Sequence, residues 1–141
     1  MIIQQLSIFL ENKSGRLAEV LEILGKEDIN ITALSVADTE KFGLVRIITP
    51  EPVKAREILK QKGFTCNVTD VVSVATPNGA IHYAKILKIL SNIKISVEYT
   101  YAFSYGDKTM IILRCDANQN AVEELKKYEI ELLTSGDLYK I

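Results

Sequence analysis

The sequence has few of the residues that build metal and redox sites. It contains one histidine, His82, and two cysteines, Cys66 and Cys115, in 141 residues. A structural zinc site takes four Cys or His ligands, so these three scattered residues do not supply one. A lone cysteine in a strand most often behaves as a small buried hydrophobic residue. The sequence therefore predicts no metal site and no cofactor.

Neither an excess of one charge nor a long apolar segment is present. The chain has 17 basic and 18 acidic residues, and this balance gives no electrostatic reason to expect nucleic acid or an anionic membrane as a partner. No apolar run approaches the roughly 20 residues needed to span a bilayer. The apolar start, Met1 to Ile3, ends at once at Gln4 and is too short for a signal peptide. We expect a cytoplasmic protein.

Motifs of catalysis are missing as well. Covalent or acid–base catalysis needs a nucleophile, a base and an orienting group within reach of one another. His82 has no Ser, Asp or Cys companion at a recognisable spacing, and the chain contains neither a phosphate-binding loop nor a dinucleotide fingerprint. We therefore expect that the protein is not an enzyme.

What the chain does contain is an internal repeat. When the sequence is shifted by 66 positions against itself, its two halves agree in chemistry without a gap over most of their length. The identical pairs include Ser7/Ser73, Asn12/Asn78, Leu21/Leu87, Ile23/Ile89, Leu24/Leu90, Ile29/Ile95, Ala55/Ala121, Glu57/Glu123, Leu59/Leu125 and Lys60/Lys126. Two copies of one fold follow.

Each copy is predicted to run strand, helix, strand, strand, helix, strand. Apolar residues at positions i, i+3, i+4 and i+7 predict the first helix of each copy, and alternation predicts the strands. The helix stripes are Leu17, Val20, Leu21, Leu24 and Tyr83, Ile86, Leu87, Leu90. The predicted strands are 6–10, 29–37, 44–48 and 64–68 in the first copy, and 95–103, 109–115 and 131–133 in the second. The second helix of the first copy is predicted to start near Pro50 to Pro52 and to stop at Gly63, and that of the second copy to cover 118–128.

The predicted domains are residues 1–68 and 69–141. A unit of about 65 residues buries little surface by itself, so we expect the two antiparallel sheets to pack side by side, which also covers sheet edges. The segment Val68 to Val74 joins the copies without a flexible linker composition. The alternating tail, Asp137 to Ile141, predicts one more strand.

This α+β, ferredoxin-like unit resembles the ACT domain of metabolic regulators. The resemblance lies in the segment Leu6 to Leu21, with its glycine-bearing turn before the first helix, and in Asp28-Ile29-Asn30-Ile31. ACT domains typically show Pro-Gly in that turn and Gly-Ile-Asn-Ile at the second strand; here Ser14 and Asp28 replace the first residue of each. In the second copy Ile81 stands at the position of Gly15, while Gly79 lies two residues earlier, so we expect a reshaped second loop.

The resemblance implies a small regulatory protein that binds a free amino acid where this loop faces a neighbouring domain. A helix N-terminus offers unpaired N–H groups and partial positive charge to a carboxylate, and polar loop groups receive the ammonium. The residues that we expect at the ligand are Asn12, Lys13, Ser14, Gly15, Arg16, Leu17, Asn30, Ile31, Asn78 and Tyr99.

Each of these residues has an alternative role. Gly15 either admits the ligand or only permits the turn, and Ser14 or Asn12 is equally suited to cap the helix. Arg16 is either a ligand contact or a solvated charge, and Asn30 either binds or satisfies local backbone. Tyr99 shares a strand face with Tyr101 and Phe103, which form either an aromatic wall beside the ligand or a surface buried at a seam.

Two other functions compete with amino-acid sensing. RNA-binding domains share the βαββαβ order, but they stack bases on aromatic residues of the central strands, and strand 44–48 has none. The alternative that stays open is a ligand-independent, dimerising regulatory subunit whose partner is a metabolic enzyme or a transcription regulator. On either interpretation we expect a homodimer.

Overall fold

The computed structural model describes residues 2–11, 15–38 and 42–139. Within these ranges no helix is long and apolar enough to cross a membrane. The chain divides into two compact units, Gln4–Thr69 and Asp70–Ile141, and the second of them also includes Met1–Ile3.

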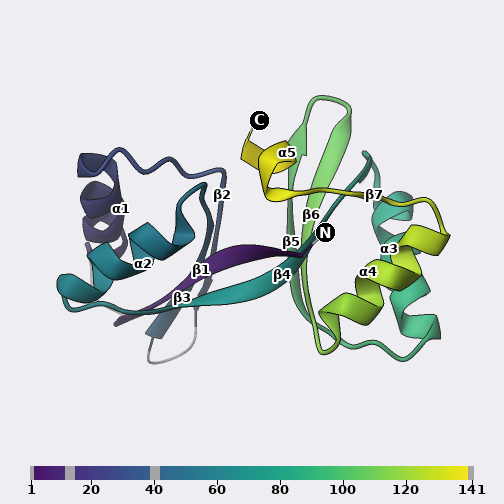
Figure 1. Cartoon of the computed structure of the whole chain (residues 1–141), viewed down its shortest axis with the longest axis horizontal. Coiled ribbons are helices and arrows are strands. Elements are labelled where there is room, and N and C mark those ends of the chain that lie inside the picture. The colour runs from purple at the N-terminus through teal and green to yellow at the C-terminus, as the bar shows by residue number, and fades with distance from the viewer. Residues whose placement is uncertain (1, 12–14, 39–41, 140–141) are drawn as a thin grey trace. The chain divides into compact units, whose positions relative to one another are not determined.

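The first unit has the predicted order of elements. Its strands follow the order β2-β3-β1-β4, and all pairings with β3 are antiparallel. Figure 1 shows both of its helices on one face of this sheet. The elements are β1 (Ile2–Glu11), α1 (Arg16–Lys26), β2 (Ala33–Asp38), β3 (Phe42–Ile48), α2 (Pro52–Gln61) and β4 (Thr65–Pro77).

The second unit repeats this arrangement. Its strands follow the order β5-β6-β4-β7, and its two long helices again cover one face (Figure 1). Strand β4 therefore serves both copies: it is the last strand of the first and the first strand of the second. The further elements are α3 (Ala80–Asn92), β5 (Val97–Tyr105), β6 (Lys108–Cys115), α4 (Asn118–Lys127), β7 (Glu131–Leu132) and α5 (Ser135–Tyr139). The prediction of two tandem βαββαβ copies is confirmed.

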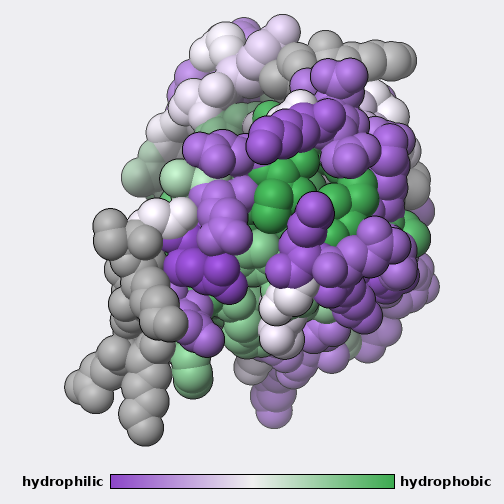
Figure 2. Space-filling view, turned by 90° about the vertical axis from the view of Figure 1, so that its left-hand side faces the viewer, coloured by the Kyte–Doolittle hydropathy of each residue, from purple (hydrophilic) through white to green (hydrophobic). Residues whose placement is uncertain are grey.

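The two cores are built from the same repeat positions. In each unit the apolar stripes of the helices pack on the strands that they cover, which removes large aliphatic side chains from water. The equivalent buried pairs are Leu6/Val72, Ile8/Val74, Val20/Ile86, Leu24/Leu90, Ile29/Ile95, Val45/Ile111, Ile47/Leu113, Ala55/Ala121 and Leu59/Leu125. Figure 2, which looks onto the side that carries α1 and α2, shows a hydrophobic area framed by hydrophilic side chains.

The helix ends repeat as well, and they correct the predicted start of the second strand. Asp28 and its equivalent Lys94 both have positive φ, 55° and 61°, directly after a helix. The amides of Ile29 and Ile95 then bond to the carbonyls of Leu24 and Leu90, each at 3.0 Å. This closes the helix by a left-handed cap with a buried hydrophobic residue behind it. Ile29 is thus apolar because it anchors the helix end, and β2 begins only at Ala33.

The predicted strand at the C-terminal tail is wrong. Residues Ser135–Tyr139 form the short helix α5. Thr134 and Asp137 cap its start reciprocally, because Thr134 N and Oγ1 donate to Asp137 Oδ2 at 2.9 Å and Asp137 N donates to Thr134 Oγ1 at 3.2 Å. Leu138 is fully buried. The capping pair outweighs the alternating pattern, and Lys140 and Ile141 lie outside the described residues.

Candidate functional site

The first helix begins on a glycine that holds a conformation unfavourable for other residues. Gly15 is the residue before α1, with φ 86° and ψ −7°, and Glu19 N donates to its carbonyl at 3.0 Å. No side chain of the described residues caps the helix here. A Cβ built on Gly15 would meet nothing within 4 Å among the described atoms. The bend is therefore open on the side where a side chain would project.

A hollow of about 410 Å³ lies beside this helix start. Volumes of about 300–1,000 Å³ are usual for small-molecule sites. Four segments of the first unit supply its walls: the end of β1, the start of α1, the start of β3 and the turn after α2. The lining residues, which we call the first hollow, are Phe9, Leu10, Glu11, Arg16, Phe42, Gly63, Phe64 and Thr65.

Arg16 is the polar centre of the first hollow. Its guanidinium lies over the ring of Phe64, 4.4 Å from the centroid, and Nη1 donates to Glu19 Oε2 at 2.9 Å. The stacking and the ion pair hold the side chain on the pocket side of the helix. Its buried Nε–H has no acceptor among the described residues. The first hollow thus contains a guanidinium in a fixed orientation, whose Nε–H can still donate a hydrogen bond to a ligand.

The other residues predicted in the first copy have different places. Asn12, Lys13 and Ser14 lie outside the described residues. Leu17 is half-buried and packs against the core of its unit. Asn30 and Ile31 are exposed in the segment between α1 and β2 and do not line the first hollow. Of the predicted set in this copy, the structure places Arg16 in the hollow and Gly15 directly before it.

The equivalent loop of the second copy is reshaped as the sequence predicts. Helix α3 starts at Ala80, two positions earlier in the repeat than α1, and the residue before it is Gly79 with φ 124°. Ile81, at the position of Gly15, is inside the helix and is 75% exposed. A β-branched residue is poorly suited to positive φ, so the glycine and the helix start have moved together.

Asn78 ties this second loop to the turn between β5 and β6. Its Nδ2 donates to the Gly106 carbonyl at 3.2 Å, and its Oδ1 accepts from Thr109 Oγ1 at 2.7 Å. Its backbone N–H also donates to the Asp107 carbonyl at 3.3 Å. In the structure the amide of Asn78 thus holds two parts of the unit together.

A second hollow, of about 460 Å³, lies next to this loop. Its lining residues are Ala75, Thr76, Pro77, His82, Lys85, Asp107, Lys108, Tyr128, Glu129, Ile130 and Glu131. Eight of them are the residues found 66 positions after the eight that line the first hollow. The repeat therefore creates a cavity at the same place in both copies, although the side chains around it differ.

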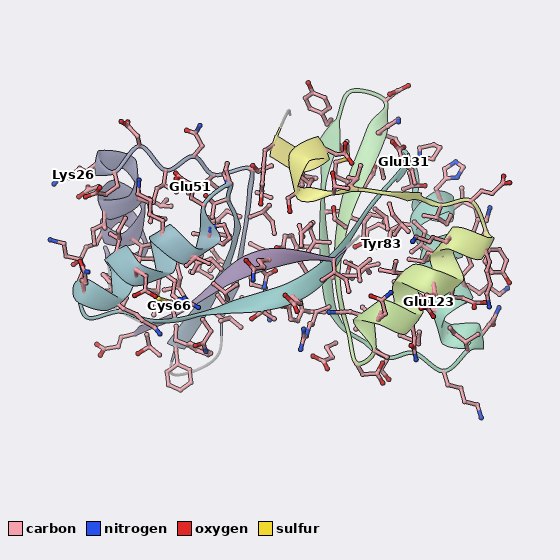
Figure 3. All side chains as sticks on the ribbon, in the orientation of Figure 1. Lys26, Glu51, Cys66, Tyr83, Glu123 and Glu131 are labelled. Atoms are coloured by element: carbon pink, nitrogen blue, oxygen red, sulfur yellow. The ribbon has the colours of Figure 1, made fainter. Side chains whose placement is uncertain are left out.

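Charged groups dominate the second hollow. Lys108 Nζ lies 2.9 Å from Glu131 Oε2, and Glu131 is labelled in Figure 3. The hydrogen bond and charge of Glu131, with a smaller contribution from Asp107, raise the pKa of the Lys108 ammonium. Lys85 and Glu129 form no ion pair with another described residue.

Tyr99 lies away from both hollows. On β5 it pairs with Arg114 of β6, whereas its neighbour Thr100 pairs with Leu113 on the helix-covered face. The hydroxyl of Thr100 lies 2.6 Å from that of Tyr83 on α3, so Thr100 faces this helix. Tyr83 is labelled in Figure 3. Tyr99, together with the half-buried Tyr101 and Phe103, therefore occupies the face of β5 opposite the helices.

The cysteines are buried as predicted, at 1% and 2% exposure for Cys66 and Cys115. Burial raises the pKa of both thiols, that of Cys115 to about 11. Among residues 2–11, 15–38 and 42–139, no three His, Cys, Asp or Glu side chains gather closely enough to hold a metal ion.

The sequence reasoning missed most of the side chains that line the first hollow. Glu11 pairs with Phe42 at the open end of the β1–β3 ladder, and Phe64 follows the glycine that ends α2. These residues are far apart in sequence and come together through strand pairing. The strand order of a βαββαβ unit could have predicted these neighbours, because it places the end of the first strand beside the starts of the third and fourth strands.

A family model and a solved structure both match this chain over its whole length. A sequence model of the family described as ACT domain pair matches residues 1–141. The chain is similar to the crystal structure of protein BT0572 from Bacteroides thetaiotaomicron, with 43% identity and a TM-score of 0.94, covering 100% of this chain and 98% of that one. No curated protein matches it.

More distant structures share the fold. The ligand-free regulatory subunit of aspartate kinase from Thermus thermophilus has 12% identity and a TM-score of 0.66, covering 90% of this chain and 96% of that one. The corresponding subunit from Thermus flavus has 13% identity and a TM-score of 0.60, covering 90% and 94%.

Proposed function

The chain belongs to the ACT domain pair family, and from this membership we propose that it is a regulatory protein that senses a free amino acid. ACT domains are regulatory rather than catalytic modules. The observation that carries the proposal is the first hollow, an open cavity with an oriented arginine in its wall, beside a helix start that no described side chain caps.

The chemistry of the first hollow suits a zwitterion with an apolar side chain. The guanidinium of Arg16 and the N-terminus of α1 attract a carboxylate. Glu11, which also lines the hollow, offers a carboxylate to an ammonium group. Phe9, Phe42 and Phe64 offer aromatic surface to the rest of the ligand, and Phe9 and Phe42 are 45% and 50% exposed without one. In our proposal a neighbouring ACT domain completes this site.

Calorimetric titration of the full chain with each of the twenty amino acids tests the proposal. We expect heat from at least one amino acid with a large apolar side chain, and a higher melting temperature in its presence because the ligand stabilises only the folded state. Arg16→Met should weaken binding about tenfold or more, through the loss of a charge-assisted bond of roughly 1.5–3 kcal/mol.

Arg56→Met provides the matched control. Arg56 has the same side-chain exposure, 29% against 30%, and likewise pairs with a neighbouring glutamate, but it lies on α2 outside the hollow. Equal effects of the two substitutions, or no heat with any amino acid, would refute the proposed site.

A second candidate function, assembly without a ligand, is favoured by the outer surface of α3. Ile81 and Tyr128 are 75% and 49% exposed there and border a groove of about 680 Å³. A second copy of the chain fits this surface by charge, because α3 presents Lys85 and Lys88 where α1 presents Glu19 and Glu22 at the equivalent repeat positions. A symmetric pair would place α1 of each copy against α3 of the other.

Sedimentation with and without the amino-acid panel separates the two functions. If α3 mediates assembly, Ile81→Asp should dissociate a dimer that forms without any amino acid. Val53→Asp, which changes a 45% exposed side chain on α2, should leave that dimer intact. A dimer insensitive to Ile81→Asp excludes α3 as its interface.

A further inference from the structure

The second hollow differs from the first in ways that follow the repeat. Three wall residues that are phenylalanine in the first hollow are replaced at the equivalent positions: Phe9 by Ala75, Phe42 by Lys108 and Phe64 by Ile130. Gly63 and Thr65 are replaced by Glu129 and Glu131. The fold thus keeps the cavity while its lining changes from aromatic to charged.

The positive and negative side chains that line the second hollow do not balance one another. Lys108, Asp107 and Glu131 form a group with one positive and two negative charges, in which Lys108 pairs with Glu131 at 2.9 Å. Outside this group are one cation, Lys85, and one carboxylate, Glu129, that form no ion pair with another described residue. A ligand that neutralises the whole wall therefore needs one anionic group, for Lys85, and two cationic groups.

We infer that the second hollow is a separate binding site for a basic amino acid, which carries one carboxylate and two cationic groups. The carboxylate pairs with Lys85, on the second turn of α3. One cationic group pairs with Glu129, and the other pairs with the excess negative charge around Asp107 and Glu131. The absence of phenylalanine from these walls disfavours a purely apolar side chain.

This site does not depend on ligand binding at the first hollow. All of its lining residues belong to the second unit, and none is shared with the first hollow. The two hollows therefore give one chain two ligand classes, an apolar and a basic amino acid, rather than two copies of one site.

Replacement of Glu129 by glycine provides a test that separates binding from stability. Glu129 has φ 57°, and the equivalent residue of the first copy is Gly63, with φ 88°. Glu129→Gly relieves the positive φ while it removes the ligand carboxylate. Lys94→Gly is the matched control, because Lys94 has φ 61° at the end of α3 and does not line the hollow.

Calorimetric titration with L-lysine and L-arginine, and with L-methionine as a neutral side chain of similar length, gives the readout. Because we propose that apolar amino acids bind in the first hollow, the comparison uses the Arg16→Met chain. We expect both basic amino acids to bind this chain at least tenfold more tightly than methionine does. Glu129→Gly should weaken their binding about tenfold, while Lys94→Gly changes it less than twofold. Both substitutions should raise the melting temperature by roughly 2–5 °C, which shows that the chains are folded.

A second pair of variants tests the anionic end of the ligand. Lys85→Met should weaken L-lysine binding about tenfold, and Lys126→Met, which changes an exposed lysine of α4 outside the hollow, should not. Equal affinity of the Arg16→Met chain for lysine and methionine, or equal effects of the two variants in either pair, would overturn the inference. If the Arg16→Met chain no longer binds apolar amino acids but still binds lysine, the two ligands occupy separate sites, as inferred.

Discussion

The two units of this chain show which parts of a duplicated fold are held constant and which vary. Their buried helix and strand positions agree pair by pair, and all four long helices end in the same left-handed cap, at Asp28, Gly63, Lys94 and Glu129. The two hollows occupy equivalent places, yet few of their lining residues agree in chemistry. Core packing and helix termination therefore restrict which residue types are tolerated at the positions that serve them. Residues that line a cavity are not restricted in this way and can differ between the two copies.

The largest effects should come from the shared core, where the units are most alike. Leu24 and Leu90 are equivalent and fully buried. Leu24→Ala and Leu90→Ala should each lower the free energy of unfolding by about 2–5 kcal/mol, because each removes buried methyl groups and leaves a cavity. Urea denaturation of the two variants measures this. A loss below about 1 kcal/mol at either position would show that the repeat does not make the two cores equivalent.

The two units differ in backbone at the start of their first helix, where α1 follows Gly15 and α3 follows Gly79. Gly15→Val should cost roughly 1–3 kcal/mol, because a β-branched residue is strained at φ 86°, although the site has room for its side chain. It should also abolish the ligand-induced rise in melting temperature. Gly15→Asn, which tolerates positive φ, should cost less and retain part of that rise.

Thermal unfolding with and without the apolar amino acid distinguishes the roles of this glycine. If Gly15→Val keeps the full ligand-induced rise, Gly15 serves the turn and not the ligand. If the Val variant is unfolded at room temperature, the glycine is essential to the fold and the Asn variant alone reports on binding.

An exchange of hollow residues tests whether the linings set the ligand classes. Phe42 and Lys108 are equivalent exposed residues at the starts of β3 and β6. Phe42→Lys should weaken binding of the apolar amino acid about tenfold, and Lys108→Phe, which adds aromatic surface to the second hollow, should strengthen binding of an apolar amino acid there by a similar factor. Because the Lys108–Glu131 ion pair is exposed, its loss should change stability little. Unchanged selectivity in both variants would mean that other residues determine the ligand.

The sequence predicted most of the fold and only part of the site. Hydrophobic periodicity located the helices, and the repeat identified the two copies, because both depend on local spacing. The tail was misassigned because its Thr134–Asp137 cap outweighs an alternating pattern, and Ile29 was assigned to a strand because burial alone does not separate a strand from a helix anchor. Of the candidate site, Arg16 was predicted, while Phe42 and Phe64 become neighbours only through tertiary pairing.

The smallest expected effect concerns the two cysteines, one in each core cluster. Burial raises the pKa of the Cys115 thiol to about 11, and Asp116 and Glu98 add to the shift. Burial also raises the pKa of Cys66, but Lys60 and Arg56 oppose that shift. A raised pKa in the folded state stabilises the protein below the thiol's ordinary pKa of about 9, and this contribution is lost as the pH rises toward about 11.

Stability should therefore fall between about pH 9 and pH 11, and Cys115 should account for more of the fall than Cys66. Urea midpoints at pH 8 and pH 10 for Cys115→Ala and Cys66→Ala measure the two contributions. Both substitutions remove a buried sulfur and lower stability at pH 8, so only the change between the two pH values is informative. Cys115→Ala should flatten the pH dependence more than Cys66→Ala does. The opposite order would show that neighbouring charges, and not burial, govern the ionisation of these thiols.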